Sequence, residues 1–223
     1  MRKYRLCILT ALLTLIISVQ VIIFHSSAAY ADFAHYIGEI SVGSGLVVYP
    51  TSGGQNWNTA VLHWDIQQIS ATQWHYSYDF NVPDGKHINT IYVEAKPGLT
   101  LTEIQNVTVP YSANISSYPV TVAGSSLSFM SIQFNRSGPT GNQWTVAFDT
   151  SYAPIWGDFY AKDANFYAWN SGFVVADPTV APDDGPEQGH ILVPGAVVPI
   201  PPAAWLLGSG LLGLVAFRRR FKK

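Results

Sequence analysis

Cysteine is nearly absent from this chain of 223 residues, and charged residues are scarce. The sequence holds one cysteine, Cys7, and only 12% of its residues are charged. A single thiol excludes an intramolecular disulfide, so the fold must be held together by packing. Because Cys7 lies in a segment that we expect to be removed, thiol catalysis by the mature protein is excluded as well.

Basic residues are missing from most of the chain. Of the 12 Lys and Arg residues, three lie at positions 2–5 and five at 218–223, which leaves four in between. All 14 acidic residues lie between Asp32 and Glu187, so the middle is acidic and both ends are basic. A nucleic-acid partner is therefore not expected. The apolar content of 48% and the aromatic content of 13% exclude a disordered chain and favour one folded domain.

Residues 1–31 have the pattern of a secretory signal peptide. A basic start precedes the apolar run Leu6–Phe24, and small residues follow it. We expect cleavage after Ala31, because Ala29 and Ala31 match the A-x-A pattern and Asp32 then begins the mature chain. An uncleaved N-terminal anchor is the alternative, since the apolar run is longer than usual.

Residues 197–223 predict a membrane segment with a positively charged end. As a helix, the apolar run Ala203–Phe217 spans about 23 Å, short of the roughly 30 Å hydrocarbon core. Residues 197–202 supply the missing length. The basic residues that follow are expected to keep this end of the chain in the cytoplasm. They are Arg218, Arg219, Arg220, Lys222 and Lys223.

The tail VPIPPAAWLLGSGLLGLVAFRRRFKK resembles the sorting tail of PEP-CTERM proteins, in the variant whose motif reads Val-Pro-x-Pro. In that family, exosortase recognises the tail. Exosortase is a membrane protease-transpeptidase of Gram-negative bacteria that make exopolysaccharide. The resemblance implies that exosortase is a partner and that Val198, Pro199, Ile200 and Pro201 form the motif. Either cleavage of the tail or its retention as an anchor fits this pattern.

Residues 32–176 predict strands, because apolar and polar residues alternate with a period of two. The segment from Trp74 to Val82 has aromatic residues at every second position, and Pro83-Asp84-Gly85 then predicts a turn. Similar alternation recurs along the body, although a short helix ending near Ile69 is an alternative. We expect an all-β fold, an antiparallel β-sandwich of jelly-roll or immunoglobulin-like type. Helices are expected only in the signal and the C-terminal membrane segment.

Residues 177–196 predict a linker between this body and the tail. The segment is rich in proline, glycine and acidic residues, which disfavour helices and central strands. We expect a semi-extended tether that holds the body away from the membrane.

Three blocks of the body carry a second resemblance. YSYDFNVPDGKHINTIYVEA, IWGDFYAKD and WNSGF are similar to an uncharacterised extracellular domain that recurs in PEP-CTERM proteins. That family implies no established activity. From the residues themselves, Gly157 in the second block predicts a close approach of two backbones rather than a ligand site.

The sequence lacks the motifs of common enzyme classes, so we expect no catalytic, cofactor-binding or metal-binding residues. Two histidine–carboxylate pairs, His63 with Asp65 and His75 with Asp79, share strand faces and fit metal ligation. Outward polar positions of half-exposed strands explain both pairs better.

The favoured interpretation is a non-catalytic exported protein, anchored in the cell envelope or released into the exopolysaccharide matrix. One alternative is a carbohydrate-binding module, because Trp57 and Trp169 lie in turn-rich segments that would present flat rings to a sugar. A glycan-active hydrolase is a weaker alternative, since no pair of carboxylates stands out as an acid and its partner.

Overall fold

The computed structural model describes residues 33–50, 57–108, 111–122, 125–136 and 141–197, and this part of the chain is all-β, as predicted. It contains no α-helix, only a 3-10 turn, η1 (Leu101–Glu103). The strands are β1 (His35–Val42), β2 (Gly45–Tyr49), β3 (Val61–Ser70), β4 (Gln73–Asn81), β5 (Thr90–Glu94), β6 (Tyr111–Val122), β7 (Ser125–Arg136), β8 (Gln143–Thr150), β9 (Tyr152–Gly157), β10 (Phe159–Asp163), β11 (Phe166–Asn170) and β12 (Ile191–Val197).

The predicted signal, sorting motif and membrane helix lie outside the described residues. Within the described ranges, no helix is long and apolar enough to cross a membrane.

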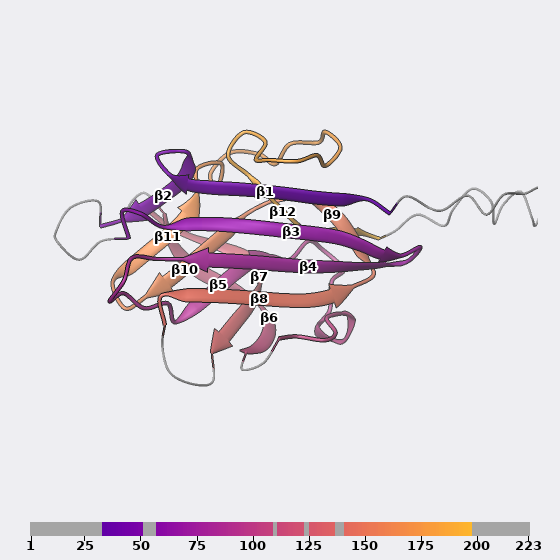
Figure 1. The fold of residues 1–223 in the computed structure, drawn as a ribbon, viewed down its shortest axis with the longest axis horizontal. Coiled ribbons are helices and arrows are strands. Elements are labelled where there is room, and N and C mark those ends of the chain that lie inside the picture. The colour runs from indigo at the N-terminus through magenta and orange to yellow at the C-terminus, as the bar shows by residue number, and fades with distance from the viewer. Residues whose placement is uncertain (1–32, 51–56, 109–110, 123–124, 137–140, 198–223) are drawn as a thin grey trace, which may run out of the picture. The chain divides into compact units, whose positions relative to one another are not determined.

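Ten strands form one sheet in the order β6-β7-β5-β10-β11-β2-β1-β3-β4-β8, and β9 pairs with β12 in a second sheet. Neighbouring strands are antiparallel except β1 and β2, which pair in parallel over a short stretch. Figure 1 shows β1, β3, β4 and β8 side by side in front of β5, β10 and β11. The large sheet is therefore curled, with one half lying over the other.

Aromatic contacts between distant strands show how far the sheet curls. Phe80 of β4 meets Phe159 of β10 with ring centroids 5.2 Å apart, although four strands lie between them in the sheet order. Phe134 of β7 stacks on Phe148 of β8 at 5.5 Å, which joins strands near opposite ends of the sheet. The inner faces of the two halves therefore share one core.

The predicted aromatic strand is confirmed as β4, and its inner face lies at the centre of this core. Tyr76 and Tyr78 are fully buried, and each hydroxyl donates a hydrogen bond to a backbone carbonyl, of Tyr152 (2.9 Å) and of Leu192 (2.8 Å). Burial raises the pKa of both phenols well above 10. These two large rings therefore pack in the core with their hydroxyl groups hydrogen-bonded.

The block IWGDFYAKD belongs to two strands in different sheets. β9 ends at Gly157 and β10 begins at Phe159, with Asp158 at the break. A Cβ on Gly157 would lie 2.5 Å from Val193 Cγ2 and 2.8 Å from Glu94 Oε2. The space beside Gly157 is therefore filled by the side chains of Val193 and Glu94, whereas the sequence predicted the approach of a second backbone.

The prediction of a linker over 177–196 is wrong, because this segment is part of the folded body. Residues 191–193 have side chains with no exposed area, and β12 pairs antiparallel with β9. Pro194 is tolerated because the register shifts between Pro194 and Ala196, and because β12 has a partner on one side only.

Residues 171–190, which we call the strap, connect β11 to β12 and cover part of β1. The Asp184 carboxylate accepts a hydrogen bond from the Ile37 amide (3.0 Å), and the Gly185 amide donates to the Ile37 carbonyl (3.0 Å). These bonds satisfy backbone groups of β1 where it has no strand beside it. Figure 1 shows the strap in light orange along this edge.

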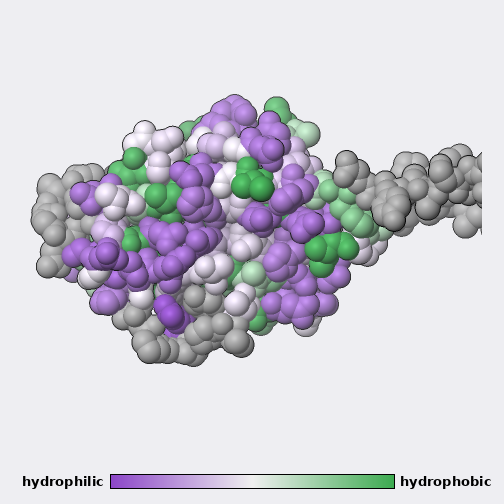
Figure 2. Space-filling view, in the orientation of Figure 1, coloured by the Kyte–Doolittle hydropathy of each residue, from purple (hydrophilic) through white to green (hydrophobic). Residues whose placement is uncertain are grey.

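The outer face of β1, β3, β4 and β8 is mainly hydrophilic, with a few separate hydrophobic residues (Figure 2). This pattern fits a sheet with one face in the core and the other in water.

Candidate functional site

Both tryptophans predicted to contact sugar are buried. Trp57 is 1% exposed and packs between Phe80 and Phe166, and Trp169 is 7% exposed within a smaller aromatic cluster. The prediction that they present exposed rings is therefore wrong. The turn-rich sequence around them did not predict that they are core residues, because a tryptophan in a glycine-rich segment can still point inward.

The two histidine–carboxylate pairs that the sequence offered as the less favoured alternative do not form. His63 instead pairs with Glu39 (3.0 Å), and Asp65 with His35 (2.8 Å), because residues opposite or diagonal on β1 and β3 are closer than residues two apart on one strand. All four side chains are about half exposed, so these pairs are solvated surface contacts.

The second pair separates in the same way. His75 Nδ1 lies 2.6 Å from Asp149 Oδ1, across β4 and β8. The Asp79 carboxylate accepts hydrogen bonds from the side chains of Gln143 and Thr145 on β8. Each histidine and each carboxylate of these pairs therefore forms its contact with a residue on the neighbouring strand.

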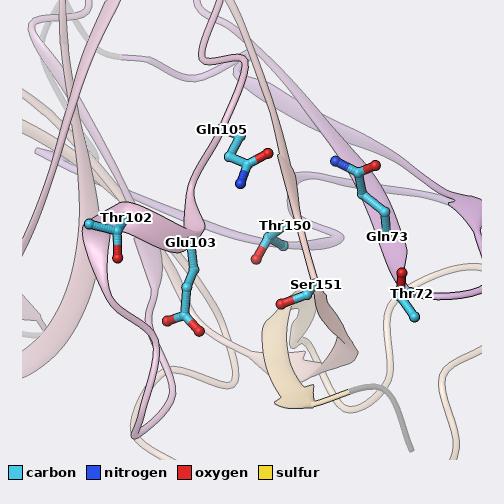
Figure 3. A pocket seen from close by; sticks show the side chains of 7 residues that line it. All are labelled: Thr72, Gln73, Thr102, Glu103, Gln105, Thr150 and Ser151. Atoms are coloured by element: carbon cyan, nitrogen blue, oxygen red, sulfur yellow. The ribbon is translucent and has the colours of Figure 1, made fainter. Parts of the chain in front are cut away.

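A small polar pocket of about 190 Å³ lies at one end of the body. Figure 3 shows its side chains arriving from three segments: η1 with the residues after it, the β3–β4 turn, and the β8–β9 junction. They are Thr72, Gln73, Thr102, Glu103, Gln105, Thr150 and Ser151.

Glu103 is the one carboxylate that lines this pocket, and it already accepts hydrogen bonds. Its Oε2 accepts hydrogen bonds from the hydroxyl and the backbone amide of Thr100, both at 2.8 Å. These bonds lower the pKa of Glu103, because they favour the charged form. Glu103 therefore caps the turn that carries it, and the pocket has no second acid to work with it.

Five titratable side chains gather inside the body, where β5, the β9–β10 junction and the strap meet. They are Glu94, Lys96, Asp158, Asp177 and His190, which we call the buried ionic cluster. The Lys96 ammonium contacts the carboxylates of Glu94 (2.6 Å) and Asp177. His190 Nδ1 lies 3.2 Å from Asp158 Oδ1 and 3.4 Å from Asp177 Oδ1.

Hydrogen bonds to the backbone hold the cluster in place. Asp158 and Glu94 exchange two of them: the Glu94 amide donates to the Asp158 carbonyl and the Asp158 amide to Glu94 Oε2, both at 2.9 Å. The Asn170 amide group donates to Asp158 Oδ1 (2.9 Å) and to the Gly189 carbonyl (3.0 Å). Asn170 Oδ1 accepts from the Phe159 amide (2.7 Å). The sequence blocks IWGDFYAKD and WNSGF therefore meet at this point.

Burial and ion pairing shift the pKa of Glu94, Lys96 and His190 in opposite directions. Burial raises the pKa of Glu94, and the ammonium of Lys96 offsets only part of this effect. Burial lowers the pKa of Lys96, but Asp177 and Glu94 outweigh it and the net shift is upward. For His190 burial again lowers the pKa, and Asp158 followed by Asp177 turns the shift upward.

A pocket of about 390 Å³ opens beside the cluster. Lys96 and Asp177 reach it from the cluster, and the Asp177 side chain is 33% exposed. Its other lining residues are Ile155, Trp156, Pro178, Thr179 and Val180. The cluster is therefore buried but has a route to solvent.

Sequence reasoning missed this cluster because Asp177 and His190 fall in the segment predicted as a linker. Two signals pointed to it. The run Ile191-Leu192-Val193 directly after His190 is a short apolar strand pattern. The blocks around Asp158 and Asn170 also carry polar residues among aromatic ones, which is typical of a hydrogen-bonded position inside a fold.

No family model matches the chain, and comparisons with curated proteins and with solved structures find no match either. The two resemblances in the sequence therefore stay predictions.

Proposed function

We propose that this chain is an exported, non-catalytic protein of the cell envelope or the exopolysaccharide matrix, sorted through its C-terminal tail by an exosortase. In this proposal the body is a β-sandwich of jelly-roll or immunoglobulin-like type, formed by the curled sheet. The signal over 1–31 brings the body out of the cytoplasm, and the tail over 197–223 directs its sorting.

The observation that carries the proposal is the partition of charge and hydropathy along the chain. Eight of the 12 basic residues lie at the two ends, each beside a long apolar run, whereas all acidic residues lie between Asp32 and Glu187. Basic residues next to apolar segments orient a chain in the membrane. The aromatic core supports the same function, because it stabilises the body without disulfides.

The two pockets support a non-catalytic role. Glycoside hydrolysis needs two carboxylates on opposite sides of the scissile bond. The lining of each pocket contributes one carboxylate, Glu103 in the first and Asp177 in the second. Thr100 donates a hydrogen bond to Glu103, and Lys96 forms an ion pair with Asp177. Each carboxylate is therefore part of a local structural contact.

The end of β12 bears on how the tail works. β12 runs to Val197, and the predicted sorting motif starts at the next residue. Val197, which the sequence assigned to the membrane segment, is the last residue of β12, so only residues 198–202 lie between β12 and the apolar run that begins at Ala203. Five residues reach at most about 17 Å. In this proposal a retained tail holds the body close to the membrane surface. Cleavage at the motif releases the body with β12 intact.

Fractionation of cells tests the proposal. The full-length chain is produced in a Gram-negative host that contains an exosortase, and the five basic residues of the tail are replaced by glutamine. We expect the wild-type chain in the membrane or at the cell surface and the glutamine variant in neither place, because the basic end orients the tail. Those residues are Arg218, Arg219, Arg220, Lys222 and Lys223.

The matched control replaces the three tail arginines by lysine, which keeps the charge and the length of the tail. This variant should be retained and processed like the wild-type chain. Equal retention of the glutamine variant and the wild-type chain would contradict the proposed role of the tail.

A further inference from the structure

We propose that Asp158, Asp177 and His190 bind one divalent transition-metal ion of the zinc class. The inference goes beyond the proposed function, because sorting through the tail does not require a metal. Each residue offers one ligand atom, and the three atoms all lie within 4.8 Å of one another. Four further observations support the site: its charge, its spacing, the environment of His190 and its access to solvent.

The charge of the cluster calls for a divalent cation. Three carboxylates, from Glu94, Asp158 and Asp177, face one ammonium, from Lys96. The cluster therefore carries one uncompensated negative charge when His190 is protonated, and two when its imidazole is neutral as a metal ligand must be, in a largely buried place. Buried charges in proteins are paired or coordinate metals. One divalent ion balances the cluster.

The spacing of the ligand atoms fits tetrahedral coordination. Zinc lies about 2.0–2.1 Å from nitrogen and carboxylate ligands, so neighbouring ligand atoms in a tetrahedron are about 3.3 Å apart. His190 Nδ1 lies 3.2 Å from Asp158 Oδ1 and 3.4 Å from Asp177 Oδ1. Two of the three edges therefore have the required length. The third pair, the carboxylate oxygens of Asp158 and Asp177, lies within 4.8 Å and has to close to the same distance when the ion binds.

His190 provides an independent observation. Its side chain has no exposed area, and neither ring nitrogen has a hydrogen-bond partner of good geometry. Buried polar groups in this state are rare. The ring is pressed against Gly172, where a Cβ would lie 2.5 Å from His190 Cδ2. Gly172 thus leaves the ring room to direct Nδ1 at the two carboxylates.

The site has an entry path and an open position. Lys96 contacts Asp177 Oδ2, which leaves Asp177 Oδ1 free to face His190. Asp177 also lines the pocket of about 390 Å³, so an ion and a water ligand can reach it from solvent. An imidazole with two carboxylates favours zinc or a similar ion over Ca²⁺ and Mg²⁺, which prefer oxygen ligands alone.

The test is a metal titration of the full-length chain. The protein is purified in detergent, stripped with a chelator and titrated with Zn²⁺ in competition with a chromophoric chelator. We expect one Zn²⁺ per chain. At a hundredfold excess over Kd, Tm should rise by about 5–10 °C, because the ion binds only the folded state.

Three variants decide the assignment. His190→Gln and Asp177→Asn should each weaken Zn²⁺ binding by at least about 100-fold, because each removes a ligand. His63→Gln is the matched control, since His63 is an exposed histidine with a carboxylate partner, Glu39. It should bind Zn²⁺ like the wild-type chain.

Circular dichroism checks that the variants fold. If His190→Gln does not fold, Asp177→Asn still decides the test, because Asp177 is partly exposed. The proposal is overturned if the folded wild-type chain shows no saturable Zn²⁺ binding, or if the folded Asp177→Asn protein binds Zn²⁺ as tightly as wild type. Tighter binding of Ca²⁺ or Mg²⁺ than of Zn²⁺ would overturn the zinc class.

Discussion

At the scale of single residues, burial separates two kinds of ion pair in this protein. The pairs His35–Asp65 and His63–Glu39 lie on the exposed outer face of the sheet and each contribute about 0–1 kcal/mol. Inside the body, loss of one partner from a buried pair leaves a charge without compensation, at a cost of about 3–5 kcal/mol. Asp158, with His190 beside it, belongs to the second kind.

Two tyrosines, Tyr118 and Tyr92, differ in the direction in which their pKa is shifted. Lys162 Nζ donates a hydrogen bond to the Tyr118 hydroxyl and lies 4.8 Å from the centre of that ring. The ammonium stabilises the phenolate, so the pKa of Tyr118 is lowered. In Tyr92 the direction is opposite, because burial raises the pKa of its phenol.

We therefore predict that Tyr118 ionises earlier than an ordinary tyrosine. In a titration followed by phenolate absorbance near 295 nm, a component below pH 10 should disappear in Tyr118→Phe. In Lys162→Met the component should move back towards pH 10, because the phenolate loses its ammonium partner.

Lys86→Met is the control for this titration, since it removes a lysine elsewhere in the body. It should leave the early component unchanged. An early component that persists in Tyr118→Phe would show that another tyrosine carries it.

At the scale of elements, the strands of the ten-stranded sheet were easier to predict from the sequence than β12 of the second sheet. Most strands of the sheet were predictable, because alternation with a period of two needs only one face in the core. β12 was not, because Pro194 and Gly195 interrupt a strand whose other residues are all apolar. A strand with one partner tolerates proline where a central strand does not.

The strand β12 supports a direct stability prediction. Val193 has no exposed area, whereas Val180 in the strap is 56% exposed. Val193→Ala should destabilise the protein by about 2 kcal/mol, since it removes two buried methyl groups and leaves a cavity. Thermal unfolding should then show a Tm lower by about 4–8 °C.

Val180→Ala is the matched control, and its effect should stay within about 0.5 kcal/mol. If residues 177–196 were a solvated linker, both substitutions would be silent. Equal Tm values for the two variants would therefore restore the linker interpretation.

The candidate site was harder to predict than the fold, for a physical reason. Strand alternation is local, whereas the buried ionic cluster joins side chains up to 96 positions apart, from Glu94 to His190. No local pattern marks Asp177 or His190 as a partner of Asp158. The same limit applied to Trp57, because a local sequence does not say which side of a loop faces the core.

At the scale of the whole molecule, the curled sheet closes one core without help from disulfides. Trp57, Trp64, Trp144 and Trp156 are almost completely buried. Each large aromatic side chain buries about 150–250 Å², so these residues supply much of the apolar burial of this body.

The basic ends also concern the whole molecule, because in the proposed function they direct the export and sorting of the entire chain. The predicted signal peptide, residues 1–31, and the predicted sorting motif, which starts at Val198, lie outside the strands, since β1 begins at His35 and β12 ends at Val197. Cleavage after Ala31 and at the motif Val198–Pro201 therefore leaves every described strand whole. The fold and the predicted processing sites are compatible.

The most direct measurement is the mass of the protein recovered from cells, with its ends sequenced by tandem mass spectrometry. We predict an N-terminus at Asp32 in every exported form. The released form should have a C-terminus near Pro201, and a membrane-retained form should end at Lys223. An intact chain of 24.4 kDa that starts at Met1 and is found in the cytoplasmic fraction would contradict the account.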